Sequence, residues 1–273
     1  MYLEHWNLSS QPFESVHDRA GLYPCEAHEG ALMKLRYAIE NQRGAALLAG
    51  PAGTGKTTLT RLLEAQLDAS FSPFVRIVFP QMSSRDLLVY LAEELGAPPA
   101  DPPRYTVEES VRRLEFYLAQ NAHLDRHAVV VVDEAHLLED CGALETLRLL
   151  LNFEIDSKPT LSLLLVGQMG LVSAIGRLPS LAERVAVSTL LRALTPEETA
   201  GYVTHRLRAA GANREIFTPD ALEALHFLGH GIPRQINRLG DLSLLVGFAD
   251  RLERLTAHEV EAVSEELVAV AAN

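Results

Sequence analysis

The sequence has little basic charge and very few lysines. Its 24 Lys and Arg residues are outnumbered by 36 Asp and Glu residues, which gives a formal net charge of −12. The lysines are Lys34, Lys56 and Lys158, and Arg112 and Arg113 form the only Arg-Arg pair. A broad phosphate-binding surface is therefore not expected, although an oligomer could gather scattered arginines on one face.

Cysteine and long hydrophobic segments are also scarce. Cys25 and Cys141 lack the close spacing of a metal site, and two thiols in 273 residues suit a reducing compartment. No apolar run approaches the roughly 20 residues that are needed to cross a bilayer. The opening MYLEHWNLSS is mixed in character and unlike a secretion signal. We therefore expect a cytoplasmic protein with no direct membrane insertion.

Short apolar strands alternate with amphipathic helices over the first two thirds of the chain. Strands are predicted at residues 45–49, 74–79, 128–132 and 161–167, with a fifth after Arg184. Helical spacing follows each of the first three strands and also covers residues 26–41. Strands that are apolar throughout and separated by helices indicate a parallel sheet covered on both faces. The sequence therefore predicts an α/β core with a five-stranded parallel sheet.

The pattern becomes entirely helical from Thr195 onwards. Two of these helices begin with Thr-Pro, which suits an N-cap residue followed by the first helical position. We expect an α/β core over residues 1–194, including an N-terminal extension over residues 1–43. An all-helical domain is expected over residues 195–273.

A complete phosphate-binding motif lies between the first strand and the following helix. Residues 50–57 read GPAGTGKT and match GxxxxGK[ST]. Glycines allow backbone N–H groups to surround phosphates, Lys56 can reach the β and γ phosphates, and the Thr57 hydroxyl can bind Mg²⁺. The predicted cofactors are ATP and Mg²⁺. The predicted nucleotide-binding residues of this stretch are Gly50, Pro51, Ala52, Gly53, Thr54, Gly55, Lys56, Thr57 and Thr58.

An acidic pair follows the third apolar strand in AVVVVDEAH. Asp133 is placed to hold Mg²⁺ with Thr57, and Glu134 to polarise the water that attacks the γ-phosphate. The letters DEAH also name a class of helicases, but those enzymes need two nucleotide-binding lobes and this chain has one phosphate-binding motif. His136 is expected to be a solvated or hydrogen-bonded residue at a helix start.

One phosphate-binding core followed by a helical domain resembles the AAA+ ATPases, in which the helical domain is called the lid. The resemblance implies that Gln168, after the fourth strand, is the polar sensor 1 residue. It also implies an arginine finger that acts on a neighbouring subunit, with Arg184 and Arg177 as the two candidates; a surface ion pair is the alternative for Arg184. In GIPRQINRL, Arg234 resembles sensor 2 and is expected to contact the nucleotide, with a helix-surface arginine as the alternative.

A narrower resemblance covers essentially the whole chain. MYLEHWNLSSQPF, the phosphate-binding motif, LLLVGQMGL and GIPRQINRL together are similar to the ExeA/GspA group of AAA+ ATPases. This resemblance implies a nucleotide-dependent homo-oligomer, a ring or a filament, that assembles or remodels a secretion or surface-polysaccharide apparatus. The alternative is a transposition regulator of the TniB or TnsC kind, which forms filaments on DNA. Tyr23 and His28 lie where such proteins wall the adenine, although a packed or capping histidine is the alternative for His28.

Overall fold

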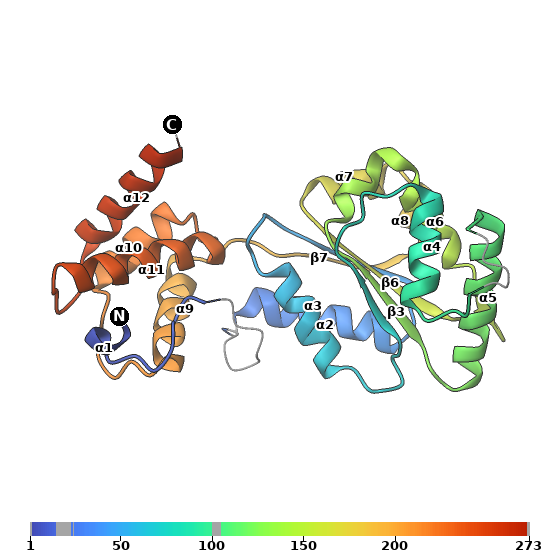
Figure 1. Cartoon of the computed structure of the whole chain (residues 1–273), viewed down its shortest axis with the longest axis horizontal. Helices are drawn as coiled ribbons and strands as arrows, with labels where there is room; N and C mark the ends of the chain where they lie inside the picture. The colour runs from blue at the N-terminus through green and yellow to red at the C-terminus, as the bar shows by residue number, and fades with distance from the viewer. Residues whose placement is uncertain (1, 15–22, 24, 100–104, 272–273) are drawn as a thin grey trace. The chain divides into compact units, whose positions relative to one another are not determined.

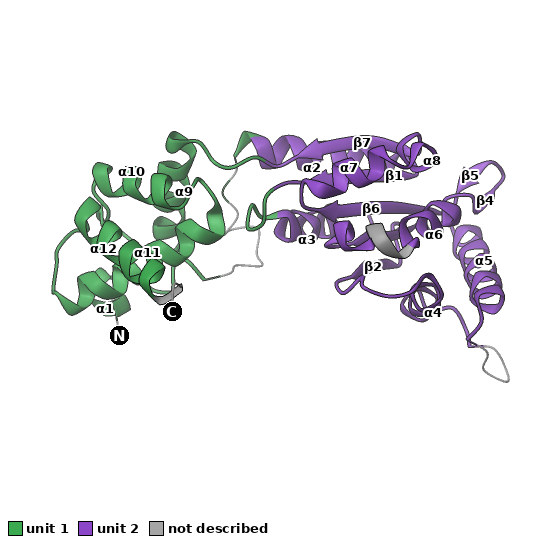
Figure 2. Cartoon of the chain, turned by 90° about the horizontal axis from the view of Figure 1, so that it is seen from above, with its two compact units in different colours: residues 1–26, 51–55, 192–273 green, residues 27–50, 56–191 purple. Residues whose placement is uncertain are grey.

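The structure is a computed structural model that describes residues 2–14, 23, 25–99 and 105–271. Its internal contacts divide the chain into two compact units (Figure 2). Unit 1 comprises residues 1–26, 51–55 and 192–273, and unit 2 comprises residues 27–50 and 56–191. Among the helices that the structure describes, none has the length and apolar character required to span a membrane.

Unit 2 is built on a five-stranded parallel sheet, as the sequence predicts (Figure 1). Its spatial order is β2-β3-β6-β1-β7. The strands are β1 (Ala45–Ala49), β2 (Phe74–Ile77), β3 (Ala128–Val132), β6 (Leu161–Gly167) and β7 (Val185–Leu190). Because β6 lies between β1 and β3, the carboxyl ends of these three strands meet at one edge of the sheet. The residues that follow them can therefore form one site.

Helices cover both faces of this sheet, and alternate strand residues enter two separate cores. Leu48 and Val131 pack with α2 (Glu26–Glu40) and α3 (Lys56–Gln66) on one face. Leu47 and Val132 pack on the other face. The helices there are α4 (Ser84–Glu94), α5 (Val107–His123), α6 (Ala143–Leu150), α7 (Gly170–Gly176) and α8 (Pro179–Ala182). Burial on both faces explains why these strands are apolar throughout.

Some local details differ from the sequence expectation. The sequence predicts a strand as far as Phe79, whereas β2 ends at Ile77, which pairs with Val132. Val132 is the last residue of β3, so residues beyond Ile77 have no neighbouring strand to pair with. A two-residue hairpin, β4 (Glu154–Ile155) with β5 (Lys158–Pro159), was not anticipated, because two-residue strands leave no periodic pattern.

Unit 1 contains α1 (Tyr2–Trp6), α9 (Pro196–Ala209), α10 (Pro219–Leu228), α11 (Pro233–Ala249) and α12 (Ala257–Ala271). The predicted Thr-Pro starts are present at Thr195 and Thr218. At Thr195 the cap is a complete capping box, in which the threonine hydroxyl accepts from the Glu198 N–H and the Glu198 carboxylate accepts from the Thr195 N–H. This pairing satisfies two N–H groups that the helix itself cannot bond.

The N-terminal segment, residues 2–14, packs on the helices of unit 1. Trp6 is fully buried, and its Nε1 donates to the Leu244 carbonyl of α11 at 2.9 Å. The Arg206 guanidinium of α9 donates through Nε to the Pro12 carbonyl at 2.6 Å and through a terminal nitrogen to the Glu14 carbonyl. The sequence predicts this segment as an extension of the α/β core, whereas the compact units group it with the helices of residues 192–273.

A buried histidine precedes β3 and makes stability dependent on pH. His127 is 4% exposed, and its Nε2 lies 2.9 Å from Ser162 Oγ. Burial lowers the pKa of His127 from 6.5 to about 4, because a charged imidazolium loses its hydration there.

Acidification from pH 7 to pH 4 is therefore expected to destabilise unit 2. Below pH 6.5 the unfolded chain binds a proton at His127 that the folded chain does not, so stability is lost as the pH falls from about 6.5 to about 4. The shift corresponds to a loss of up to about 3 kcal/mol. Urea unfolding followed by circular dichroism should show this loss, and His127→Gln should reduce it. If the parent and His127→Gln lose the same free energy of unfolding on acidification, titratable groups other than His127 cause the loss.

Candidate nucleotide-binding site

The phosphate-binding loop joins β1 to α3, and its glycines are required by its conformation. Gly53 and Gly55 have φ values of +83° and +94°, which non-glycine residues rarely adopt. At Gly50, an added Cβ would lie 2.5 Å from the Leu191 carbonyl oxygen. Thr54 is fully buried, and its hydroxyl donates to the Pro51 carbonyl across the loop at 2.9 Å.

The helix after the loop begins with the residues expected to contact phosphate. Lys56, Thr57 and Thr58 form the first turn of α3, where backbone N–H groups have no partner within the helix. The Lys56 side chain is buried, and its Nζ donates to the Gly50 carbonyl at 2.9 Å. This contact holds the ammonium group at the phosphate-binding loop rather than in solvent.

The two predicted metal ligands meet although they are 76 residues apart in the sequence. Thr57 Oγ1 donates to Asp133 Oδ2 at 2.7 Å. Adjacent oxygens in an octahedral Mg²⁺ shell lie about 2.9 Å apart when each metal–oxygen distance is near 2.05 Å, so this pair is suited to Mg²⁺. Within the described part of the chain, no group of three or more His, Cys, Asp or Glu side chains could hold a metal. A site with one carboxylate and one hydroxyl is typical of Mg²⁺ that is shared with a nucleotide.

Glu134 adopts an uncommon backbone conformation next to the metal ligand. Its φ and ψ are 51° and 33°, in the left-handed region, and it immediately precedes the 3₁₀ helix η2 (Ala135–Cys141). The Glu134 N–H donates to Asp133 Oδ1 at 3.0 Å. Such conformations persist where surrounding contacts impose them, and they are concentrated at functional sites.

Gln168 directly follows β6 and lies between the phosphate-binding loop and the acidic pair. Gly167, the last residue of β6, accepts from the Gly50 N–H at 3.2 Å. On the opposite side, the Gln168 N–H lies 3.5 Å from His136 Nδ1, and the same ring nitrogen lies 3.4 Å from Glu134 Oε2. One nitrogen cannot accept from Gln168 and donate to Glu134 at once, and both distances are long for a hydrogen bond. His136 is thus a packing link between the two predicted catalytic residues.

Arg184 lies at the amino ends of the strands, whereas the phosphate-binding loop follows the carboxyl end of β1. It is exposed in the turn before β7, and its carbonyl accepts from Ala45 N, at the start of β1, at 3.1 Å. The five residues of β1 separate the two edges by about 16 Å, beyond the reach of an arginine side chain. Arg184 donates to Asn152 Oδ1 at 2.8 Å and pairs with no acid in the part of the chain that the structure describes. Arg177 is exposed at the end of α7.

In unit 1, Arg234 lies against the phosphate-binding loop. Its N–H donates to the Gly53 carbonyl at 3.3 Å. A Cβ atom at Gly53 would lie 2.8 Å from the Arg234 Cβ and 3.0 Å from the Ile232 Cγ2. The loop and the start of α11 therefore approach as closely as glycine permits, and the Arg234 side chain remains exposed beside the loop.

Tyr23 and His28 lie in different units. Tyr23 packs on α9, where its ring centroid is 6.1 Å from Tyr202 and 5.8 Å from His205. Burial raises the pKa of Tyr23. His28 is a buried residue of α2 in unit 2, 7% exposed. A role for either residue at adenine stays a prediction.

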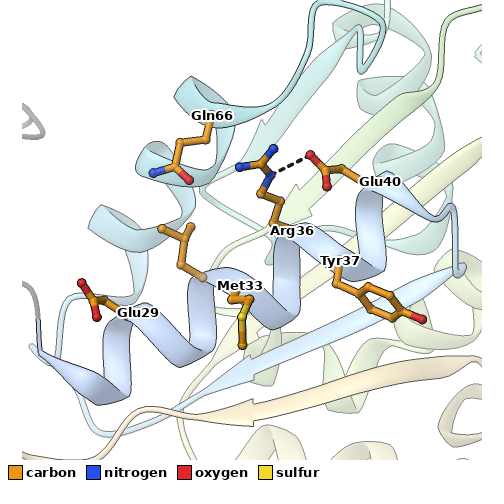
Figure 3. Close-up of a pocket in the computed structure, with 7 residues that line it drawn as sticks. Glu29, Met33, Arg36, Tyr37, Glu40 and Gln66 are labelled. Atoms are coloured by element: carbon orange, nitrogen blue, oxygen red, sulfur yellow. Dashed lines mark hydrogen bonds and ion pairs between the residues drawn. The ribbon is translucent and has the colours of Figure 1, made fainter.

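A hollow on the exposed side of α2 is separate from these residues. It has a volume of about 380 Å³. The Arg36 Nε donates to Glu40 Oε1, one turn further along α2, at 2.6 Å (Figure 3). The lining residues are Glu29, Leu32, Met33, Arg36, Tyr37, Glu40 and Gln66. None of the predicted nucleotide ligands lines this hollow, so we assign it no part in nucleotide binding.

A parallel sheet with this strand order, a glycine loop before α3 and a threonine–aspartate pair together define a P-loop ATPase. Residues 39–175 match the AAA domain family, and the chain belongs to this family of ATP-binding proteins. It is also 36% identical over 280 residues to General secretion pathway protein A of Aeromonas hydrophila. That alignment covers 97% of this chain and 50% of the relative, so the chain spans about half the relative's length.

Solved structures of similar fold include proteins from archaea and from an insect. The ORC2 protein of Aeropyrum pernix, in ADPNP and ADP complexes, gives a TM-score of 0.69 at 17% identity, covering 92% of this chain and 71% of that chain. Drosophila ORC bound to DNA gives 0.70 at 20% identity, covering 94% and 64%. A Walker-type ATPase of Pyrococcus abyssi gives 0.66 at 17% identity, covering 94% and 76%. At these identities the likeness concerns the fold alone.

Proposed function

We propose that the protein is a Mg²⁺-dependent ATPase that oligomerises and uses hydrolysis to assemble or remodel a partner complex. The observation that carries the catalytic part is the 2.7 Å contact between Thr57 and Asp133 beside the phosphate-binding loop. Thr57 and Asp133 hold Mg²⁺, which when bound neutralises charge on the phosphate oxygens. Lys56 and the first N–H groups of α3 bind the β and γ phosphates.

Glu134 is the proposed general base. The support for this role is that Glu134 directly follows Asp133, the proposed metal ligand, and that its N–H donates to the Asp133 carboxylate. Glu134 orients a water and accepts its proton as the water attacks phosphorus. Gln168 orients the same water or the γ-phosphate, and Arg234 stabilises phosphate charge from the lid. His136, which lies near both Glu134 and Gln168, restricts the positions that these two residues adopt.

The proposed active site is completed by a second subunit. Arg184 lies at the edge of the sheet away from its own phosphate-binding loop, so it can act only on the nucleotide of a neighbour. Its side chain donates to Asn152 at 2.8 Å and forms no ion pair among the described residues. An amide carries no charge, so it does not neutralise the guanidinium group, which is then available to bind a phosphate.

Mixing two inactive variants is expected to restore activity. Arg184→Ala retains an intact nucleotide site, and Lys56→Ala retains an intact arginine finger. In a mixed oligomer, a Lys56→Ala subunit can supply Arg184 to the site of an Arg184→Ala subunit. Phosphate release should therefore rise well above that of either variant alone, with a maximum at intermediate mixing ratios.

The same experiment with Arg177→Ala distinguishes the two candidate fingers. If Arg177 is the finger, the Arg177→Ala variant should be inactive alone and be rescued by Lys56→Ala, whereas Arg184→Ala should be active alone. No recovery in a demonstrated mixed oligomer of Arg184→Ala and Lys56→Ala would contradict the trans role of Arg184.

The proposed client is a protein of a secretion or surface-polysaccharide apparatus. This proposal is supported by the 36% identity to a general secretion pathway protein and by the net charge of −12, which disfavours a long contact with DNA. Coupling requires that the client bind one nucleotide state more tightly than the other. In-cell cross-linking of the Glu134→Gln protein should therefore capture an envelope-assembly protein that Lys56→Ala does not capture. Capture of chromosomal DNA in place of such a protein would contradict the proposal.

A further inference from the structure

A groove runs between α10 and α12 in unit 1. Ala224, Phe227 and Leu228 of α10 line one side, and Glu261, Ser264 and Glu265 of α12 line the other. α10 and α12 pack against each other in unit 1 (Figure 1). Its volume of about 270 Å³ lies below the roughly 300–1,000 Å³ of small-molecule pockets. The groove is therefore suited to anchoring side chains of a macromolecule rather than to enclosing a metabolite.

The apolar side of the groove is unusually exposed. Phe227 is 76% exposed, more than any other large hydrophobic side chain in the described part of the chain. Val268, 67% exposed, lies one helical turn beyond Ser264 and extends the α12 stripe. Residues spaced by three or four positions share a helix face, so Val268 lies on the same face of α12 as the groove residue Ser264. Aromatic residues are enriched in the cores of interfaces, so Phe227, on the α10 side of the groove, can serve as the centre of one.

The rim of the groove is acidic, because its two charged lining residues are Glu261 and Glu265. α10 and α12 contain Asp220, Glu223, Glu259, Glu261, Glu265 and Glu266 and no Lys or Arg. Asp220 and Glu259 accept hydrogen bonds from backbone N–H groups at the start of α12 or just before it. No ion pair involves Glu261 or Glu265 among the residues that the structure describes. These two glutamates are one turn apart on α12, an arrangement of like charges that destabilises an isolated helix.

We propose that this groove binds an amphipathic helix of a protein partner whose apolar stripe is flanked by Lys or Arg. Apolar side chains of such a helix would cover Phe227 and Val268, and its cations would relieve the repulsion between Glu261 and Glu265. Nucleic acids and anionic membranes present phosphates to a protein, and the acidic rim repels them. The groove lies within unit 1, so the proposal does not depend on ATP hydrolysis.

A display library tests the partner chemistry directly. The library would hold 15-residue helices with Leu, Ile, Met or Phe at positions i, i+4, i+7 and i+11 and with Lys, Arg, Glu, Asp, Ser or Gln at the flanking positions. Selection on the full-length protein without nucleotide should enrich Lys and Arg at the flanking positions. Enrichment of acidic or neutral sequences, or no enrichment, would overturn the proposal.

Groove variants then locate the binding surface. Fluorescence titration of a selected peptide should show affinity at least tenfold weaker for Phe227→Ser and for Glu261→Lys combined with Glu265→Lys. The matched controls are Phe116→Ser and Glu108→Lys combined with Glu115→Lys, which change exposed residues of α5 and should bind as the parent does. Equal affinity for groove and control variants would overturn the proposal. Self-association of the parent that Phe227→Ser abolishes would overturn it in favour of a second copy as the occupant.

Discussion

Glu134→Gln is expected to lower the rate of ATP hydrolysis by a factor of about 10² or more while leaving ATP binding nearly unchanged. Glutamine has the size of glutamate and can still hydrogen-bond to a water, but it cannot accept the proton that the attacking water loses. The backbone at Glu134 has a positive φ and its N–H bonds to Asp133, and neither feature requires a carboxylate side chain. The substitution should therefore remove the base without moving the metal ligand.

Two measurements on the same protein separate chemistry from binding. Steady-state phosphate release gives turnover, and titration with a fluorescent ATP analogue gives affinity. Lys56→Ala should lose affinity, because the ammonium group held by the Gly50 carbonyl is the proposed contact to the β and γ phosphates. Glu115→Gln, at an exposed position of α5, is the matched control and should behave as the parent does. Hydrolysis by Glu134→Gln at the parental rate would show that another group is the base.

The parts of the site that follow from a motif or from the topology of the sheet could be predicted from the sequence. A glycine-rich turn between an apolar strand and a helix can form only a few backbone conformations, so GPAGTGKT predicts both the loop and its chemistry. The meeting of Thr57 with Asp133 also follows, because strands of a parallel sheet end at a common edge. The roles given to Glu134, Gln168, Arg184 and Arg234 remain predictions that the variants above test.

Contacts between distant surface residues could not be predicted in this way. The contact of His136 with Gln168 joins residues 32 positions apart, and the hydrogen bond between Arg184 and Asn152 spans the same separation. Neither pair belongs to a periodic pattern or a motif. The first depends on where η2 begins, and the second on where α6 ends. Gly167 gives a local indication of the contact between His136 and Gln168. A Cβ at this position would lie 3.3 Å from His136 Nδ1, so a side chain there would crowd the histidine.

The packing of the N-terminal segment on the helices of unit 1 could likewise not be predicted from the sequence. Its aromatic residues give no helical or strand period, because α1 has only five residues. The complementary signal lies more than 200 residues away, in two glycines of α11. A Cβ at Gly240 would lie 2.7 Å from the Phe13 ring, and one at Gly247 would lie 2.8 Å from the Trp6 ring. These glycines leave the space that the two aromatic side chains fill.

Trp6→Ala is expected to lower the free energy of unfolding of unit 1 by about 3–5 kcal/mol. The indole is fully buried, donates to the Leu244 carbonyl and has the Arg214 guanidinium 5.6 Å from its ring centroid. Truncation to alanine removes all three interactions and leaves a cavity that Gly247, which has no side chain, cannot fill. The segment of residues 2–14 should then detach from α9 and α11 more readily.

Hydrogen exchange of the α11 amides measures this effect in the variant, because Trp6 is the single tryptophan and its fluorescence is lost with it. Exchange should accelerate by about two to four orders of magnitude if it reports unfolding of unit 1, since each 1.4 kcal/mol is a factor of ten. Phe227→Ala is the matched control, since Phe227 belongs to the same unit and is 76% exposed. It should change stability by no more than about 0.5 kcal/mol. Equal α11 exchange in both variants would show that the N-terminal segment does not stabilise the helices on which it packs.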